Sequence, residues 1–461
     1  MNPFLEKAVE HLEFALLHKA NFIPALVSLC EYNLGEKNFG KVNNLLQKAC
    51  FIEKNEPVIL FLKAKLHLSK SELAKAKNFI LKAIAINRNE IQYHKILFEI
   101  ETKIGNLHGT IHALEKIIDL EPSDGEAHLL LAQKLSNPDD FQRARLLYEI
   151  SIELLPKDKR PLISLSKHLC EGCKGLPDGT IQKIPEIEKS IELLHAAIQI
   201  DKACAESHFM LGRIFFEEEN FKSAEKYLNV SIQDTVFKFE SFFLMGLIHR
   251  KENKLEEAIN FFKKASESIN CKSKSLLALI EIYLQRKEYS NAEQELMNII
   301  PILISELDKL HKLTKTQTSS NQFYEARKTN EKISSKKRNL SQCYYYRYVS
   351  KNQETCNFRD LPLLFDAIDE DPFNSQAHFE IGVIKKETGK KESSRKHFEE
   401  SLNADWFNWQ SHLEISEFEK EDQNLESCVM HLQIALDLKP NSEKVQRALS
   451  AAENSKWNHP T

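Results

Sequence analysis

Apolar residues recur along most of this chain at the spacing of amphipathic helices, and the same arrangement of apolar and small residues returns every 34 positions. Gly212 and Gly246 are 34 residues apart, and Ala224, Ala258 and Ala292 follow one another at the same spacing. A period of this length is typical of repeats built from two helices and a turn. The pattern therefore predicts an all-α chain of tandem helix-turn-helix repeats.

The copy that begins at Gly125 shows why each position carries its residue type. Its eighth and twentieth residues, Ala132 and Ala144, are small, which lets the two helices of one repeat approach closely. Pro156, at the thirty-second position, cannot continue a helix and so separates one repeat from the next. Large apolar residues at positions seven, eleven, seventeen and twenty-four fill the space between the helices: Leu131, Leu135, Phe141 and Tyr148.

These features resemble the tetratricopeptide repeat family, although the tryptophan common at the family's fourth position is absent. The resemblance covers most of the chain, with copies in phase that begin at Ile23, Pro57, Ile91, Gly125, Ala205, Phe239, Ser273, Ser375 and Trp409. It implies a right-handed α-solenoid, a superhelix of stacked helix pairs with helix A of each pair on a long concave face.

The phase of the repeat divides the chain into seven segments. Residues 1–22 form a half-repeat or capping helix, 23–158 hold four regular repeats, and 159–204 hold a repeat with a loop inserted at about 172–184. Three regular repeats follow over 205–306, then two degraded repeats with a basic linker-like segment over 307–374. Two regular repeats occupy 375–442, and 443–461 form a C-terminal capping helix and tail.

Composition and charge limit the compartment and the partner. The chain is 42% hydrophobic and carries a formal net charge of −4, which argues against a chain-wide nucleic-acid surface. Its nine scattered cysteines indicate a reducing compartment rather than a disulfide framework. The longest uncharged apolar stretch is about ten residues and contains Pro301, so it is too short to span a bilayer. We expect a cytoplasmic protein, with the nucleus also open, and no membrane insertion.

One short cluster has the residue types of a metal or redox site. His168, Cys170 and Cys173 stand together in KHLCEGCKGLPDGT, but no second C-x-x-C or H-x-x-x-H follows at zinc spacing. We interpret them as residues of an exposed loop, with metal binding or thiol exchange as the alternative. Signatures of catalysis and of phosphate binding are absent from the sequence, so we expect no cofactor and no enzymatic activity.

Two further patterns carry residues of functional interest. A histidine recurs at the fourth position of five repeats, where we assign it a packing or helix-start role because successive repeats lie about 10 Å apart: His94, His128, His208, His378 and His412. The segment from Asp308 to Arg338 holds nine Lys and Arg against three Asp and Glu, and four tyrosines follow: Tyr344, Tyr345, Tyr346 and Tyr348. We interpret the charges as a solvated face and the tyrosines as packing residues; nucleic acid is the less favoured alternative.

The resemblance also implies where a partner binds, because the family uses helix A for contacts in its groove. In the three central repeats the corresponding positions carry large apolar groups with a few charges: Phe209, Met210, Arg213, Phe216, Phe243, Leu244, Leu247, Arg250, Leu277, Glu281 and Leu284. An apolar strip of this kind is typical of a binding groove. The alternative is that these side chains only contact neighbouring helices.

The sequence therefore predicts a non-catalytic scaffold that binds a peptide or helix of a partner protein. Arg213 and Arg250 would pair with its acidic or backbone groups, and Phe209, Phe216 and Phe243 would accept its apolar anchors. One alternative is the substrate-recruiting part of a transferase or other complex whose catalytic part lies elsewhere. Another is self-association through the N-terminal half-repeat.

Overall fold

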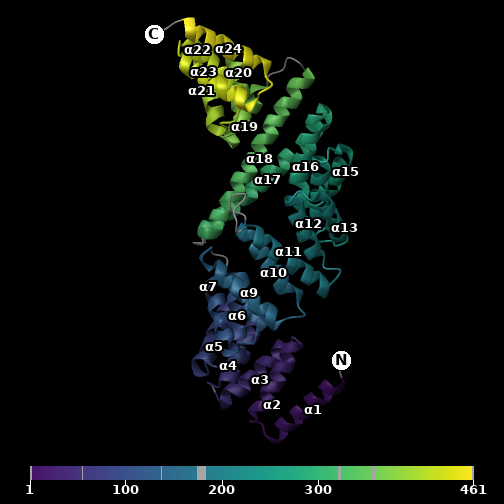
Figure 1. Cartoon of the computed structure of the whole chain (residues 1–461). Coiled ribbons are helices and arrows are strands. Elements are labelled where there is room, and N and C mark those ends of the chain that lie inside the picture. The colour runs from purple at the N-terminus through teal and green to yellow at the C-terminus, as the bar shows by residue number, and fades with distance from the viewer. Residues whose placement is uncertain are drawn as a thin grey trace. The chain divides into compact units, whose positions relative to one another are not determined.

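The computed structural model describes residues 3–53, 55–135, 138–173, 183–319, 323–355 and 360–458, and these residues form helices and turns without any strand. They divide into two compact parts, an N-terminal part (Met1–Ile214) and a C-terminal part (Phe215–Thr461), with the boundary inside α12 (Ala205–Glu217). Each part consists of consecutive helix pairs (Figure 1). The predicted all-α solenoid of helical repeats is therefore confirmed.

The N-terminal part opens with α1 (Pro3–His18), which precedes the first complete pair. Each later helix A begins at the first residue that the period predicts. The pairs are α2 (Ile23–Gly35) with α3 (Phe39–Ile52), α4 (Pro57–Ser69) with α5 (Leu73–Ile86), α6 (Ile91–Ile104) with α7 (Leu107–Leu120), α8 (Gly125–Lys134) with α9 (Phe141–Leu154), and α10 (Lys159–Cys173) with α11 (Lys183–Ile200). Most of the predicted insertion at 172–184 lies outside the described residues.

The C-terminal part continues the series to a final single helix, α24. Its helices are α13 (Phe221–Ser231), α14 (Lys238–Lys251), α15 (Leu255–Ala265), α16 (Ile269–Gln285), α17 (Tyr289–Ser319), α18 (Phe323–Thr355), α19 (Leu361–Glu370), α20 (Ser375–Glu387), α21 (Lys391–Ala404), α22 (Trp409–Glu421), α23 (Leu425–Leu438) and α24 (Glu443–Asn458). None of the helices described in either part is both long and apolar enough to cross a lipid bilayer.

The hairpin of α17 and α18 departs from the regular repeat. These helices of 31 and 33 residues pack against each other along their length (Figure 1). The phase of the two degraded repeats is kept, but the turns expected at 306–307 and 340–341 are helical, so each long helix joins a helix B to the next helix A. Other repeat junctions carry a turn such as Pro372-Phe373-Asn374, whereas these junctions read Ile304-Ser305-Glu306 and Arg338-Asn339-Leu340. Neither junction has the proline found at 372, although other junctions, such as 266–268 and 405–408, turn without proline or glycine.

Within a repeat, the eighth and twenty-fourth residues have complementary sizes. Phe262 and Phe398 are fully buried at the twenty-fourth position, and each faces a glycine at the eighth, Gly246 and Gly382. A Cβ added to either glycine would lie 2.7 Å from a ring carbon of that phenylalanine. Because protein interiors are close-packed, a larger residue on one helix requires a smaller one on the other.

The turn inside each repeat is also built to one design. The fifteenth residue has a left-handed backbone in eight repeats; two are glycines, Gly105 and Gly389, and the others are Lys37, Ser71, Glu219, Asn253, Lys287 and Gln423. A residue with a side chain costs about 1–2 kcal/mol in this conformation. In four repeats the next residue is an asparagine whose side chain accepts a backbone N–H at the start of helix B: Asn38, Asn106, Asn220 and Asn424.

Buried serine hydroxyls connect successive repeats. The Oγ atoms of Ser231 on α13 and Ser241 on α14 lie 2.7 Å apart, and those of Ser401 on α21 and Ser411 on α22 lie 2.8 Å apart. All four side chains are fully buried, so each hydroxyl needs a hydrogen-bonding partner. These bonds help to fix how one helix pair stacks on the next.

Candidate protein-interaction surface

In the C-terminal part, helices α14 and α16 present a row of partly buried apolar side chains. Phe243 and Leu247 on α14, and Leu277 and Leu284 on α16, occupy the fifth, ninth and twelfth positions of their repeats. One side of each packs on the core formed by α15 to α18, and some of its surface stays in water. Together with the partly exposed Leu244, these residues form what we call the helix-A strip.

The sixth position of helix A is buried in two of the three central repeats and partly exposed only at Leu244, which corrects one predicted site residue. Met210 is only 2% exposed, and Ala278 at the equivalent position of α16 is 6% exposed. Met210 therefore does not line a surface. Phe209 and Arg213, also in the N-terminal part, are partly exposed.

The predicted charged groups of the surface are already engaged. Arg250 Nη1 on α14 lies 2.6 Å from Glu281 Oε2 on α16. The Tyr346 hydroxyl on α18 donates to the other oxygen of Glu281 at 3.3 Å. Burial, followed by the charge of Glu281, raises the pKa of Tyr346 to about 12, so the phenol keeps its proton. Arg213 also has an interaction partner, so neither arginine is a free cation for a ligand.

Lysine side chains cover two of the aromatic rings that the sequence singled out. Lys274 Nζ on α16 lies 4.5 Å from the ring centroid of Phe243 on α14. Phe216 packs beside Phe221, with ring centroids 6.2 Å apart, and Lys251 Nζ lies 5.8 Å from its centroid. These contacts between helices leave the aliphatic residues of the strip as its more accessible part.

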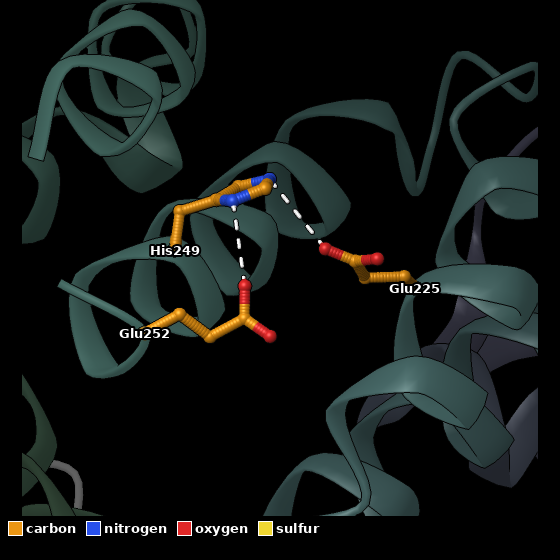
Figure 2. A group of neighbouring side chains, drawn as sticks. All are labelled: Glu225, His249 and Glu252. Carbon is orange, nitrogen blue, oxygen red and sulfur yellow. Dashed lines mark ion pairs between the residues drawn. The ribbon is translucent and has the colours of Figure 1, made fainter. Parts of the chain in front are cut away.

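A histidine between two carboxylates was missed by the sequence patterns, since its members lie on α13 and at the end of α14. His249 stacks on Phe261 with ring centroids 5.1 Å apart. Its Nε2 is 3.5 Å from Glu225 Oε1 and its Nδ1 is 3.9 Å from Glu252 Oε2. Figure 2 shows the two carboxylates approaching different ring nitrogens.

One ligand atom from each of Glu225, His249 and Glu252 lies within 4.8 Å of the other two, a spacing that could hold a metal ion. Nothing else in the described residues points to an ion there. The oxygen of Glu252 that faces His249 is also paired with Lys254 Nζ at 2.7 Å. The arrangement places a histidine of α14 beside a carboxylate of α13, at a distance at which a protonated imidazole forms an ion pair.

The predicted cysteine cluster is only partly within the described residues. His168 Nε2 bonds to the Phe141 carbonyl oxygen at 2.9 Å, and its ring stacks on that of Phe141. Cys170 Sγ lies 3.2 Å from Ser190 Oγ. The side chain of Cys173 lies outside the described ones. His168 and Cys170 therefore take part in separate packing contacts.

The fourth-position histidines contact the backbone just before or at the start of helix A. His94, His378 and His412 reach the carbonyl oxygen six residues earlier, and His128 and His208 reach the one four residues earlier. The packing or helix-start role expected for these residues agrees with these bonds. In the last two regular repeats the second ring nitrogen meets another histidine: His378 Nδ1 lies 3.1 Å from His397 Nδ1, and His412 Nδ1 lies 2.8 Å from His431 Nδ1.

The tyrosines of α18 are packing residues. Tyr346 packs on the core of α15 to α18, while Tyr345 and Tyr348 belong to the core shared with α19 and α20. Tyr344 packs against both cores. Because consecutive residues of a helix point in different directions, the run holds two neighbouring cores rather than forming one stacking platform.

The tetratricopeptide repeat family model matches residues 239–269, which span α14, α15 and the turn between them. The same helix pair recurs in phase along the structure. The matched helix pair is a tetratricopeptide repeat. A comparison with characterised proteins finds no match to the chain.

Three solved structures of distant sequence match parts of this chain. YrrB, described as a tetratricopeptide-repeat protein with an unusual peptide-binding site, is 14% identical, with a TM-score of 0.36 over 43% of this chain and 96% of YrrB. The C-terminal part of a repeat protein from Cytophaga hutchinsonii is 12% identical, with a TM-score of 0.44 over 54% and 97%. PilF from Pseudomonas aeruginosa is 15% identical, with a TM-score of 0.36 over 46% and 90%.

Proposed function

We propose that this tetratricopeptide-repeat chain is a non-catalytic scaffold that binds a peptide or helix of a partner protein along the helix-A strip. The observation that carries the proposal is the row of aliphatic side chains on α14 and α16 that packs on the core yet keeps part of its surface in water. Repeats of this family form protein-interaction scaffolds, so an apolar strip on helix A is the surface that a partner segment would cover.

The contacts between helices define the chemistry of the partner. Since Arg250 and Glu281 neutralise each other at 2.6 Å, this arginine is not a free cation for an acidic group of the partner. A segment with aliphatic side chains three or four residues apart, as on one face of a helix, would bury them against Leu244, Leu247 and Leu277. Polar groups of that segment would meet the Arg250–Glu281 pair.

Substitutions at the strip test this function. Leu244→Glu and Leu284→Glu place a charge where an apolar contact is expected, without removing a fully buried side chain. The matched control is Met297→Glu on α17, where the side chain is 55% exposed and outside the strip. Partners captured from lysate by the wild-type chain are quantified by mass spectrometry, and circular dichroism verifies that each variant is folded.

We expect a partner to be retained by wild type and Met297→Glu and reduced at least tenfold by each strip variant, because an unpaired buried carboxylate opposes binding strongly. Equal recovery from all four proteins would refute the proposal.

A further inference from the structure

The distal half of the α17–α18 hairpin is an antiparallel coiled coil of its own. On α17 the buried or half-buried positions include Leu303, Leu307, Leu310, Thr314 and Gln317, alternately four and three residues apart. On α18 they include Ala326, Thr329, Ile333 and Leu340, which keep the same heptad spacing. The Thr329 hydroxyl donates to Gln317 Oε1 at 2.8 Å across the seam. This half of the hairpin thus has a defined inner seam and a defined outer face.

Three lysines line the outer face of distal α17. Lys309, Lys312 and Lys315 follow one another at three-residue spacing, and in the heptad they occupy the positions directed away from the seam. All three are exposed, and no carboxylate of the described residues pairs with them. We call these three residues the lysine face.

Other lysines of the hairpin are neutralised close to its base. Lys336 Nζ lies 2.6 Å from Glu306 Oε2, and Lys337 Nζ lies 3.6 Å from Glu370 Oε2. The lysine face differs from these lysines in that it forms no ion pair among the described residues, although Asp308 stands one turn before Lys312. Three like charges on one helix face repel each other, and an anionic partner would relieve this repulsion.

The length of the lysine face limits the size of that anion. Residues 308–338 carry nine basic and three acidic residues, whereas the rest of the chain carries 54 basic and 64 acidic residues. From Lys309 to Lys315 the face spans about 9 Å at 1.5 Å per residue, which matches a segment of a few residues.

We propose that the lysine face is a docking surface for a short acidic segment, rich in Asp and Glu, of a partner protein. Carboxylates spaced along such a segment would pair with Lys309, Lys312 and Lys315. Single-stranded nucleic acid is disfavoured, because its binding sites combine basic groups with aromatic rings. Among the described residues of distal α17, the exposed large apolar residue is Leu313, which is aliphatic and has no ring to stack on a base. The surface is separate from the helix-A strip and does not depend on the function proposed for that strip.

Binding of a labelled octaglutamate peptide to the full chain, followed by fluorescence anisotropy at 50 mM salt, tests the proposal. The test variant is Lys309→Glu/Lys312→Glu/Lys315→Glu. The matched control, Lys222→Glu/Lys263→Glu/Lys272→Glu, makes the same change in net charge at exposed lysines of α13, α15 and α16. A Lys→Gln triple variant of the lysine face, which removes the charge without reversing it, guards against unfolding of the hairpin.

The expected result is that wild type and control bind octaglutamate, that the Gln variant binds at least fivefold more weakly, and that the Glu variant binds at least tenfold more weakly. Raising the salt to 300 mM should weaken wild-type binding, since these exposed charges are screened. Absence of wild-type binding, or equal loss in the control, would overturn the proposal. So would tighter binding of a 12-base-pair DNA duplex through the same three lysines, which would assign the face to nucleic acid.

Discussion

Gly382→Ala tests the size rule that links the two helices of a repeat. The added Cβ would lie 2.7, 2.8 and 3.0 Å from three carbons of the Phe398 ring. That ring is fully buried and packs beside Phe379 and Phe418, with centroids 5.7 and 6.2 Å away, so it has little room to retreat. Overpacking of this kind costs about 1–3 kcal/mol. Alanine returns about 1 kcal/mol because it favours a helix more than glycine does, so the net loss should be up to about 2 kcal/mol.

The same substitution should act differently once the ring is removed. In a Phe398→Leu background the clash disappears, and Gly382→Ala should then stabilise its repeat by about 1 kcal/mol. The coupling between the two positions should therefore be about 1–3 kcal/mol. Hydrogen exchange of the amides of α20 and α21 measures this locally, which matters because a repeat array need not unfold in one step. An identical effect of Gly382→Ala in both backgrounds would refute the rule.

Three further predictions follow from the geometry of the repeats. Burial, reinforced by His378, lowers the pKa of His397 to about 4. Because the folded state disfavours the protonated imidazole, thermal melts should show full stability above about pH 6.5 and a decline toward pH 4, worth roughly 1 kcal/mol at pH 5 for this partly exposed ring. His397→Leu should flatten that decline. The backbone is left-handed at both Lys287 and Gly389. Lys287→Gly should therefore raise local stability, and Gly389→Lys should lower it, by up to about 1 kcal/mol each. Hydrogen exchange showing a stability change of the same sign for both variants would contradict this. The side chain of Asn374 accepts a backbone N–H at 3.0 Å and donates to a buried hydroxyl at 2.9 Å. Asn374→Ala should therefore lower local stability, measured by hydrogen exchange, by about 1–2 kcal/mol. A loss under about 0.5 kcal/mol, the size of a neutral surface change, would show that these two bonds do not stabilise the repeat.

The repeat was readable from sequence because its packing rules act over short distances. The period placed the first residue of helix A at Ile23, Pro57, Ile91 and Gly125, where the structure has it. Small and large residues at fixed positions are needed in every copy, so they recur and can be counted. The continuous helix at 304–306 could not have been predicted in this way, because residues 266–268 also lack proline and glycine and yet form a turn.

The surface was harder to predict because it depends on neighbours in other repeats. Met210 is buried because of how its helix packs on the core. The helix positions that the family usually exposes in its groove do not predict that burial. Arg250 pairs with Glu281, and Lys386 pairs with Glu417, in each case from the twelfth position of one helix A to the ninth of the next in the regular phase. That spacing of 31 residues is visible in the sequence and is the signal that could have shown these charges to be paired.

A photo-crosslinking residue placed at Leu244 or at Met297 measures the central claim most directly. Both positions lie in the C-terminal part, but only Leu244 belongs to the helix-A strip, and Met297 serves as the matched exposed site. If the strip binds a partner segment, irradiation should attach a defined polypeptide at position 244 with little or none at 297, and Leu284→Glu should abolish the product. Equal crosslinking from the two positions, or a product at 244 that survives Leu284→Glu, would contradict binding along the strip.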